Sequence, residues 1–302
     1  MGPSRNYSED ETLSYELKDS FTGVAYAMYH YLWMKDSEGK TCPNVNIPHT
    51  VIFKGGKPRE WFFTSLKENI LKRKHKSNVT HFNIVETMAV GEEADLGICC
   101  SFRGAVAHPI VDSNRHNNHG VFRMKNGMHV DEDSAQWLGV KALRELLPAN
   151  VSIVSTLVAE LHDGVLQRWV HPRGGIHNTV YKALWSPHAC VIQCRTTRAR
   201  MNEVGVTLAD RLSTWEGPIW SCEQSTILGS VLQSRAEVMC ESIASHVSNV
   251  SSGNIVIASM NVLFKVDDSN RIWLLFCGGL KRDPSSLGPR DMPGGGAGGN
   301  IG

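Results

Sequence analysis

The strongest fold signal lies in residues 255–277, IVIASMNVLFKVDDSNRIWLLFC, where two apolar segments flank a short polar turn. The turn, Asp268-Ser269-Asn270, contains residue types that favour tight turns, and the flanking segments are rich in aliphatic and aromatic residues. Because apolar residues dominate both segments instead of alternating with polar ones, we expect a β-hairpin buried within a sheet.

The same arrangement of two apolar segments around a turn occurs twice more, upstream of this hairpin. The pairs are Val151–Glu160 with Val165–Val170 around His162-Asp163-Gly164, and Val180–Trp185 with Ala189–Arg195 around Ser186-Pro187-His188. Asp-Gly is a strong hairpin signal, and four strands joined by tight turns predict an antiparallel meander. Further short strands are predicted at Thr50–Lys54, His81–Val90 and Leu96–Phe102.

Three other segments have the residue spacing of helices: Arg59–Lys76, Asp131–Leu147 and Trp220–Val247. In the first, apolar residues recur at every fourth position from Phe62 to Ile70, and the second is followed by Pro148, a helix breaker. Together with the strands, these segments predict an α+β fold, in which a largely antiparallel sheet packs against two or three helices.

The length of 302 residues is close to the size at which single hydrophobic cores divide, and we expect one main domain. Residues 1–20 are predicted to be a mobile, acidic N-terminal extension, and residues 21–281 a single α+β domain that could subdivide near 105–130. Residues 282–302 are rich in Pro and Gly and are expected to form a flexible tail, because they carry too few apolar side chains to offset the entropy of ordering.

The charges almost cancel, with 31 Lys+Arg against 30 Asp+Glu, a formal net charge of +1. A balance so close to zero gives no overall field for a polyanion, so we expect no nucleic-acid partner. No apolar run reaches the roughly 18–20 residues that span a bilayer, and the first residues lack the apolar segment of a secretory signal. We therefore expect a cytoplasmic protein with no membrane partner, whose eight cysteines are reduced.

Two groups of side chains are candidates for chemistry. His116 and His119 lie three residues apart in a polar loop with Asp112, and two imidazoles with a carboxylate could bind zinc or iron. Cys99 and Cys100 could serve as thiol nucleophiles with a remote histidine. We favour a surface loop rich in Asn and His as the explanation of the first group and a buried apolar strand as that of the second, and therefore assign no metal site.

Nucleotide-binding motifs are absent from the sequence. It contains neither Gly-x-x-x-x-Gly-Lys-Ser/Thr nor Gly-x-Gly-x-x-Gly between a strand and a helix, the two patterns that place phosphates on backbone N–H groups. No Gly-x-Ser-x-Gly nucleophile elbow occurs either. We therefore expect no cofactor and assign no catalytic residue.

Two local clusters of cationic side chains occur in this chain of near-zero net charge. The residues of the first cluster are Lys72, Arg73, Lys74 and Lys76, and those of the second are Arg195, Arg198 and Arg200. Neither cluster has the interleaved aromatic residues typical of single-strand nucleic-acid binding. Local patches on a neutral chain favour contacts with other proteins of a larger assembly, and an acidic surface such as that of tubulin would fit them.

The hairpin around Asp268 also resembles a closing hairpin of uncharacterised ciliary or flagellar axoneme-associated proteins of protists. The residues that match the pattern are Phe264, Lys265, Val266, Asp267, Arg271, Trp273 and Cys277. The resemblance implies a non-enzymatic, microtubule-associated component of the axoneme. The alternative is an enzyme of unrecognised class, dependent on a metal at His116 and His119 or on the thiols of Cys99 and Cys100.

Overall fold

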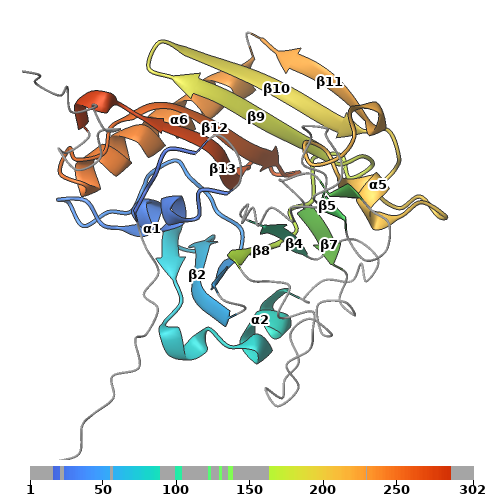
Figure 1. Cartoon of the computed structure of the whole chain (residues 1–302), viewed down its shortest axis with the longest axis horizontal. Coiled ribbons are helices and arrows are strands. Elements are labelled where there is room, and N and C mark those ends of the chain that lie inside the picture. The colour runs from blue at the N-terminus through green and yellow to red at the C-terminus, as the bar shows by residue number, and fades with distance from the viewer. Residues whose placement is uncertain are drawn as a thin grey trace, which may run out of the picture.

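The computed structural model describes residues 16–20, 24–54, 57–88, 99–103, 122–123, 129–130, 135–138, 163–228 and 230–286. For the strands between residues 99 and 138 it describes the backbone. Figure 1 shows the two sheets that these segments form.

The first sheet is antiparallel and, within the described residues, has six strands. Its order is β3 (Ile70–Arg73), β2 (Lys57–Ser65), β1 (Thr50–Lys54), β8 (Asp163–Arg168), β4 (Cys99–Arg103) and β7 (Ala135–Leu138). β1 lies inside this sheet, and the side chains of Val51, Ile52 and Phe53 are almost wholly buried. Burial on both faces accounts for the unbroken apolar run of this strand.

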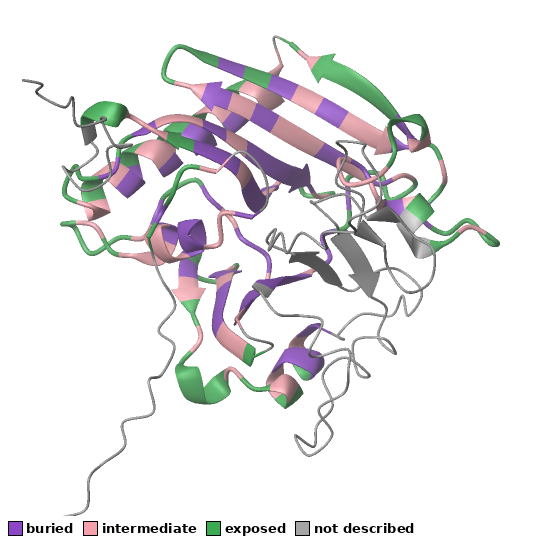
Figure 2. Ribbon diagram, viewed as in Figure 1, coloured by how far each residue is buried: buried purple, intermediate pink, exposed green. Residues whose placement is uncertain are grey.

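The second sheet is also antiparallel, with five strands among the described residues. Its order is β11 (Cys222–Ile227), β10 (Ala189–Thr197), β9 (Thr179–Ser186), β12 (Ile257–Val266) and β13 (Ile272–Arg282). Helix α6 (Val231–Val250) packs along one face of this sheet, against β9, β10 and β12. The helix buries a stripe of residues at helical spacing: Ala236, Met239, Cys240, Ile243 and Val247. Figure 2 shows that burial is most continuous along β12 and β13.

The two sheets share one hydrophobic core, and helix α1 (Ala27–Trp33) lies within it. The Tyr29 hydroxyl donates a hydrogen bond to the backbone oxygen of Leu275 in β13. The buried Gln167 side chain in β8 donates to Thr50 Oγ1 and to the same Leu275 oxygen, both at 2.9 Å. A buried amide that satisfies groups on both sheets fixes their relative position.

The remaining elements are short. They are α2 (His81–Met88), α5 (Leu208–Leu212), the 3-10 helices η1 (Lys76–Asn78), η2 (Ile219–Ser221) and η3 (Pro284–Ser286), and the strand pair β5 (Phe122–Arg123) and β6 (His129–Val130). In the described part of the chain, no helix has both the length and the apolar character needed to cross a membrane.

The predicted α+β class is confirmed, as is the hairpin around Asp268, now seen as β12 and β13. The β9–β10 hairpin around Pro187 and the strand Thr50–Lys54 are confirmed too. The helix predicted for Trp220–Val247 begins only at Val231, because the preceding residues form η2 and the edge strand β11.

Four local predictions are wrong. Arg59–Lys76 forms the β2–β3 hairpin instead of a helix, because β2 pairs with β1 on its other side. His81–Met88 is a helix instead of a strand. Ala135–Leu138, predicted as helix, pairs with β4, and Asp163-Gly164 lie within β8 instead of a turn, paired with β1 and β4.

Several predictions fall on parts of the chain that the structure does not describe. These parts include residues 1–15, the strand predicted at 151–160, and the tail beyond residue 286. The division into segments 1–20, 21–281 and 282–302 therefore stays a prediction.

Candidate functional site

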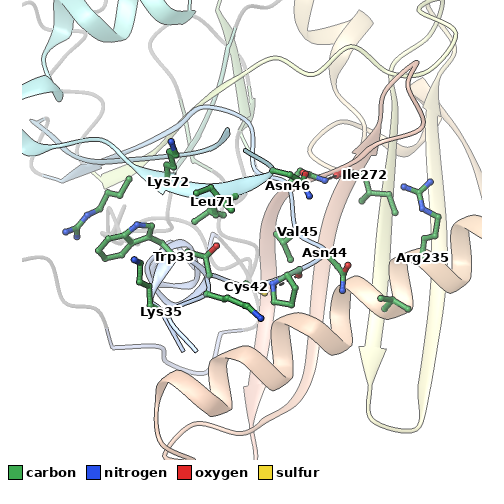
Figure 3. A pocket seen from close by; sticks show the side chains of 18 of the residues that line it. Trp33, Lys35, Cys42, Asn44, Val45, Asn46, Leu71, Lys72, Arg235 and Ile272 are labelled. Carbon is green, nitrogen blue, oxygen red and sulfur yellow. Dashed lines mark hydrogen bonds between the residues drawn. The ribbon is translucent and has the colours of Figure 1, made fainter. Parts of the chain in front are cut away.

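A groove lies between α1, β3 and the first half of α6. Its volume is about 1040 Å³. One wall consists of Trp33 at the end of α1 together with β3, and the opposite wall of exposed residues near the start of α6 (Figure 3). The segment 41–46, which we call the strap, runs between the two walls.

The charges along this groove have one sign. Five cationic side chains line it, and none of its lining residues is an Asp or Glu. We call these five the groove cations: Lys35, Lys40, Lys72, Arg73 and Arg235. An excess of one sign in a concave site raises the local concentration of oppositely charged ligands.

The groove cations differ in whether a carboxylate outside the lining holds them. Lys40 Nζ lies 2.7 Å from Glu38, and Lys72 is paired with Glu68. Among the described residues, neither Lys35 nor Arg235 has an ion-pair partner, and both are exposed. These two side chains are therefore available to an incoming anion.

Arg73 is the most strongly held groove cation. Its guanidinium lies 3.9 Å from the centre of the Trp33 ring and donates a hydrogen bond to Glu60 Oε1 at 3.0 Å. The Glu60 residue is only 4% exposed, so the pair is partly withdrawn from water. Stacking on an aromatic ring together with a carboxylate contact gives the guanidinium a fixed orientation at the groove wall.

The strap is attached to both neighbouring elements. Asn46 Nδ2 donates to the backbone oxygen of Ile272, and Leu274 N donates to the backbone oxygen of Asn46, so β13 holds one end. Asn44 Nδ2 donates to Ser242 Oγ in α6 at 3.0 Å. Burial raises the pKa of the Cys42 thiol far above its ordinary value, so Cys42 is not a thiolate nucleophile.

A tight turn at residues 36–40 leads into the strap. The Asp36 carboxylate accepts hydrogen bonds from the backbone N–H groups of Glu38 and Lys40, both at 2.9 Å, and these bonds lower the pKa of Asp36. Gly39 has φ +77°, a conformation that suits glycine. Lys40, at the end of this turn, is one of the residues that line the groove.

The start of α6 contributes a further positive end. The side chain of Ser230 caps the helix by accepting a hydrogen bond from Gln233 N at 3.1 Å. Val231, Ser234 and Arg235 in the first turns line the groove. Because the N-terminal end of a helix carries partial positive charge, α6 reinforces the field of the groove cations.

A second, smaller hollow of about 360 Å³ lies between the residues just before β1, the end of β8 and the β12–β13 turn. His49 Nδ1 accepts a hydrogen bond from Trp61 Nε1 at 3.1 Å, and burial, aided by Arg168 and Lys74, lowers the pKa of His49 to about 4. The Asp267 carboxylate accepts from the backbone of the turn and from a tryptophan of β13. The polar side chains of His49 and Asp267 at this hollow therefore make hydrogen bonds within the fold.

The candidates for chemistry predicted from the sequence receive no geometric support. His116, His119 and Asp112 lie outside the described residues, and Cys99 and Cys100 lie in β4, where only the backbone is described. Within the part of the chain that the structure describes, no cluster of three or more His, Cys, Asp or Glu side chains could hold a metal ion.

The first predicted cationic cluster is divided between two places. Lys72 and Arg73 line the groove, whereas Lys74 lies over the rings of Trp61 and Phe63 at 5.0 and 5.5 Å, and Lys76 begins η1. The run was predicted to end a helix, which is wrong, because it spans the end of β3 and the start of η1.

The second predicted cluster lies on the five-stranded sheet. Arg195 donates hydrogen bonds to Gln224 Oε1 and the Thr214 backbone oxygen, and its guanidinium lies 4.2 Å from the centre of the Trp215 ring. Arg198 is paired at 3.6 Å with the exposed Glu223. The Arg195 contacts are structural ones, which leaves less cationic surface than the sequence indicates.

Sequence reasoning missed three groove cations, namely Lys35, Lys40 and Arg235. No local pattern could have indicated them, because up to 200 positions separate them along the chain. In the sequence, the groove could be anticipated only from the adjacent cations Lys72 and Arg73. The fold brings the other three groove cations to the same site.

The sequence matches no protein-family model and no curated protein. Similar solved structures include the D-cycloserine synthetase DcsG, with a TM-score of 0.40 and 9% identity over 83% of this chain and 63% of that one. The macrocyclase MdnC from Microcystis aeruginosa, bound with precursor peptide MdnA, has a TM-score of 0.36 and 6% identity over 77% of this chain and 48% of that one. The D-Ala:D-Ser ligase VanG from Enterococcus faecalis has a TM-score of 0.30 and 10% identity over 78% of this chain and 48% of that one.

These similar structures are enzymes, and none is a cytoskeletal protein. They contradict the interpretation of the chain as a structural component of a ciliary or flagellar axoneme. The chain spans about half to three fifths of the length of these structures. At this distance the likeness transfers no activity, and the resemblance of the hairpin 264–277 stays a prediction.

Proposed function

We propose that the chain binds a small organic molecule with several negative charges in the groove between α1, the strap and α6. The observation that carries the proposal is a groove lined by five cations and no carboxylate, with Lys35 and Arg235 exposed at opposite walls. Its volume of about 1040 Å³ is at the upper end of ligand sites in proteins, roughly 300–1,000 Å³.

The groove also has apolar groups that suit an organic ligand better than an inorganic ion. Trp33, Val45 and Leu71 are among its lining residues, and Val238 adds an exposed aliphatic side chain. A ligand with an apolar body and two or more phosphates or carboxylates would contact both kinds of lining. If the chain is an enzyme of unrecognised class, as the sequence allows, this anion is its substrate, and a cytoplasmic location would give access to such metabolites.

The experiment is a calorimetric titration with ATP as a polyanionic organic probe and adenosine as its uncharged counterpart. We expect ATP to bind and adenosine to bind at least about 10-fold more weakly, since the charged groups supply much of the binding free energy. The double substitution Lys35→Ala with Arg235→Ala should weaken ATP binding by roughly 10–100-fold.

The matched control is Arg198→Ala with Arg200→Ala, which removes the same positive charge at residues that do not line the groove. An equal loss in the control would show attraction by overall charge and contradict the proposal, as would failure of ATP to bind. A polyglutamate peptide that binds without competition from ATP would favour an acidic protein partner instead.

A further inference from the structure

Strand β11 forms one edge of the five-stranded sheet and is open to solvent. It is the last strand in the sheet order, and its residues from Glu223 to Thr226 are all exposed (Figure 2). Its pairing with β10 is regular, from Ile192 opposite Ile227 to Thr197 opposite Cys222. The other side of β11 presents backbone N–H and C=O groups that no strand of the described residues pairs with.

This edge lacks the features that normally keep sheet edges apart. Native edge strands are protected by proline, lysine, inward-pointing charges or bulges. β11 has the sequence CEQSTI, without proline or lysine, and its register with β10 contains no shift. Its single charge, Glu223, is paired at 3.6 Å with Arg198.

Large apolar side chains lie exposed at both ends of the same strand. Ile219 and Trp220 in η2 are 72% and 79% exposed, and Leu228, just after the strand, is 73% exposed. A single exposed aliphatic residue is ordinary on a protein surface, but three around an unprotected edge indicate a contact surface.

We propose that β11 is the interface of a homodimer, in which it pairs antiparallel with β11 of a second copy of the chain. The two five-stranded sheets would then join into one continuous sheet. In a two-fold interface the same surface serves both copies, and so apolar residues at both ends of one strand satisfy both partners.

The geometry of antiparallel pairing restricts the register. In an antiparallel pair, two residues that lie opposite each other direct their backbone groups either both toward the partner strand or both away from it. Because this direction alternates along a strand, a residue cannot lie opposite the neighbour of its own counterpart. A two-fold axis must therefore place one residue opposite its own counterpart. With Gln224 on the axis, the end of β11 next to Trp220 in one copy meets the end next to Leu228 in the other, and Glu223 faces an uncharged serine, Ser225.

The alternative register is less complementary. With Ser225 on the axis, the charged Glu223 would face Ile227. This pair sets an apolar side chain against a charged one. The register centred on Gln224 brings apolar groups together and opposes no like charges, which is the arrangement that favours a second copy as the partner.

The exposed apolar residues around β11 supply part of the area that a stable dimer buries. Two buried tryptophans remove roughly 300–500 Å² from water, as part of the roughly 1,200–2,000 Å² typical of stable interfaces. The paired backbone of β11, together with the exposed Ile219 and Leu228 from both copies, would add to this area.

The test is sedimentation of the full chain across micromolar concentrations. We expect a monomer–dimer equilibrium that Trp220→Glu shifts toward monomer by roughly 100-fold, as for a large aromatic side chain buried in an interface. Val204→Glu, at a residue that is 97% exposed and outside this surface, is the matched control and should leave the dimer intact. Circular dichroism checks that each variant folds, and Trp220→Ser replaces Trp220→Glu if the latter does not.

A second variant tests the register. Under mild oxidation, Gln224→Cys should link two chains by a disulfide, because opposite residues lie within the Cα separation that a disulfide needs. Glu223→Cys, displaced from its counterpart by two positions, should link far less. A monomer at all concentrations, a dimer that resists both substitutions at Trp220, or equal cross-linking at both cysteines would overturn the proposal.

Discussion

Two cationic clusters, the groove cations and the Arg195–Arg200 cluster, differ in what their side chains contact. Arg195 donates to two acceptors and stacks on Trp215, so its charge is used within the fold. In the groove, Arg73 is held in a similar way, but Lys35 and Arg235 are exposed with no ion-pair partner in the described part of the chain. Positive charge in a sequence therefore indicates binding only where the fold leaves it unpaired.

The largest effect on stability is expected at Arg73. Arg73→Ala should lower the free energy of unfolding by about 3 kcal/mol, because the buried Glu60 carboxylate loses its guanidinium and Trp33 loses its stacking partner. Urea denaturation measures the change. Lys72→Ala, which breaks the more exposed pair with Glu68, should cost less than about 1 kcal/mol. Equal losses would contradict the distinction between the buried ion pair of Arg73 and the exposed ion pair of Lys72.

The next effect concerns His49, a residue outside the groove whose pKa is lowered by burial and in part by the positive charge of Lys74. Its pKa is lowered to about 4, so the folded state binds the proton more weakly than the unfolded state does. The free energy of unfolding therefore has its full value above pH 6.5, where His49 is neutral in both states. It falls by about 2 kcal/mol, after allowance for partial exposure, as the pH drops toward 4.

The control for His49 is needed because burial also lowers the pKa of His30 and His246. Unfolding of the wild type and of His49→Gln should therefore be compared at several pH values. The variant should lose less stability between pH 6.5 and 4. Parallel curves for the two proteins would show that His49 is not the group responsible.

A smaller effect is expected at Arg195. Arg195→Ala should destabilise the fold by about 1 kcal/mol, because it removes the hydrogen bonds to Gln224 and the Thr214 backbone and the contact with Trp215. Arg195→Lys keeps the charge but not the planar donor geometry, and should recover less than half of the loss. Full recovery by lysine would mean that charge alone matters there.

The smallest effect is expected at Arg198. Its ion pair with Glu223 is exposed on both sides, so Arg198→Ala should change the free energy of unfolding by less than about 0.5 kcal/mol. A larger loss in thermal unfolding would show that the second cluster is as strongly integrated as Arg73.

The sequence predicted the fold best where turn chemistry and apolar content agreed. At the β12–β13 turn, Asp267 accepts a hydrogen bond from Arg271 N, and Asn270 has φ +58°, a conformation that asparagine tolerates. The helix α2 could have been recognised as well. Thr80 accepts from Asn83 N as a cap, and the buried residues Ile84, Val85 and Met88 have helical spacing.

Other parts could not be predicted from local patterns. Phe62, Leu66 and Ile70 have helical spacing, but only Phe62 is buried, because pairing of β2 with β1 and β3 outweighs the periodicity. The groove combines Lys35 with Arg235, and only tertiary packing of α1 against α6 brings these residues to one site.

The attachment of the strap has a consequence for the kinetics and entropy of binding. Asn46 is tied to β13 and Asn44 to α6, so the segment between the walls is already ordered before any ligand arrives. A ligand would lose its own freedom on entry but would not have to restrict that of the strap. Such a preorganised site favours association without a slow closing step, and backbone amide exchange at the strap should be the same with and without ligand.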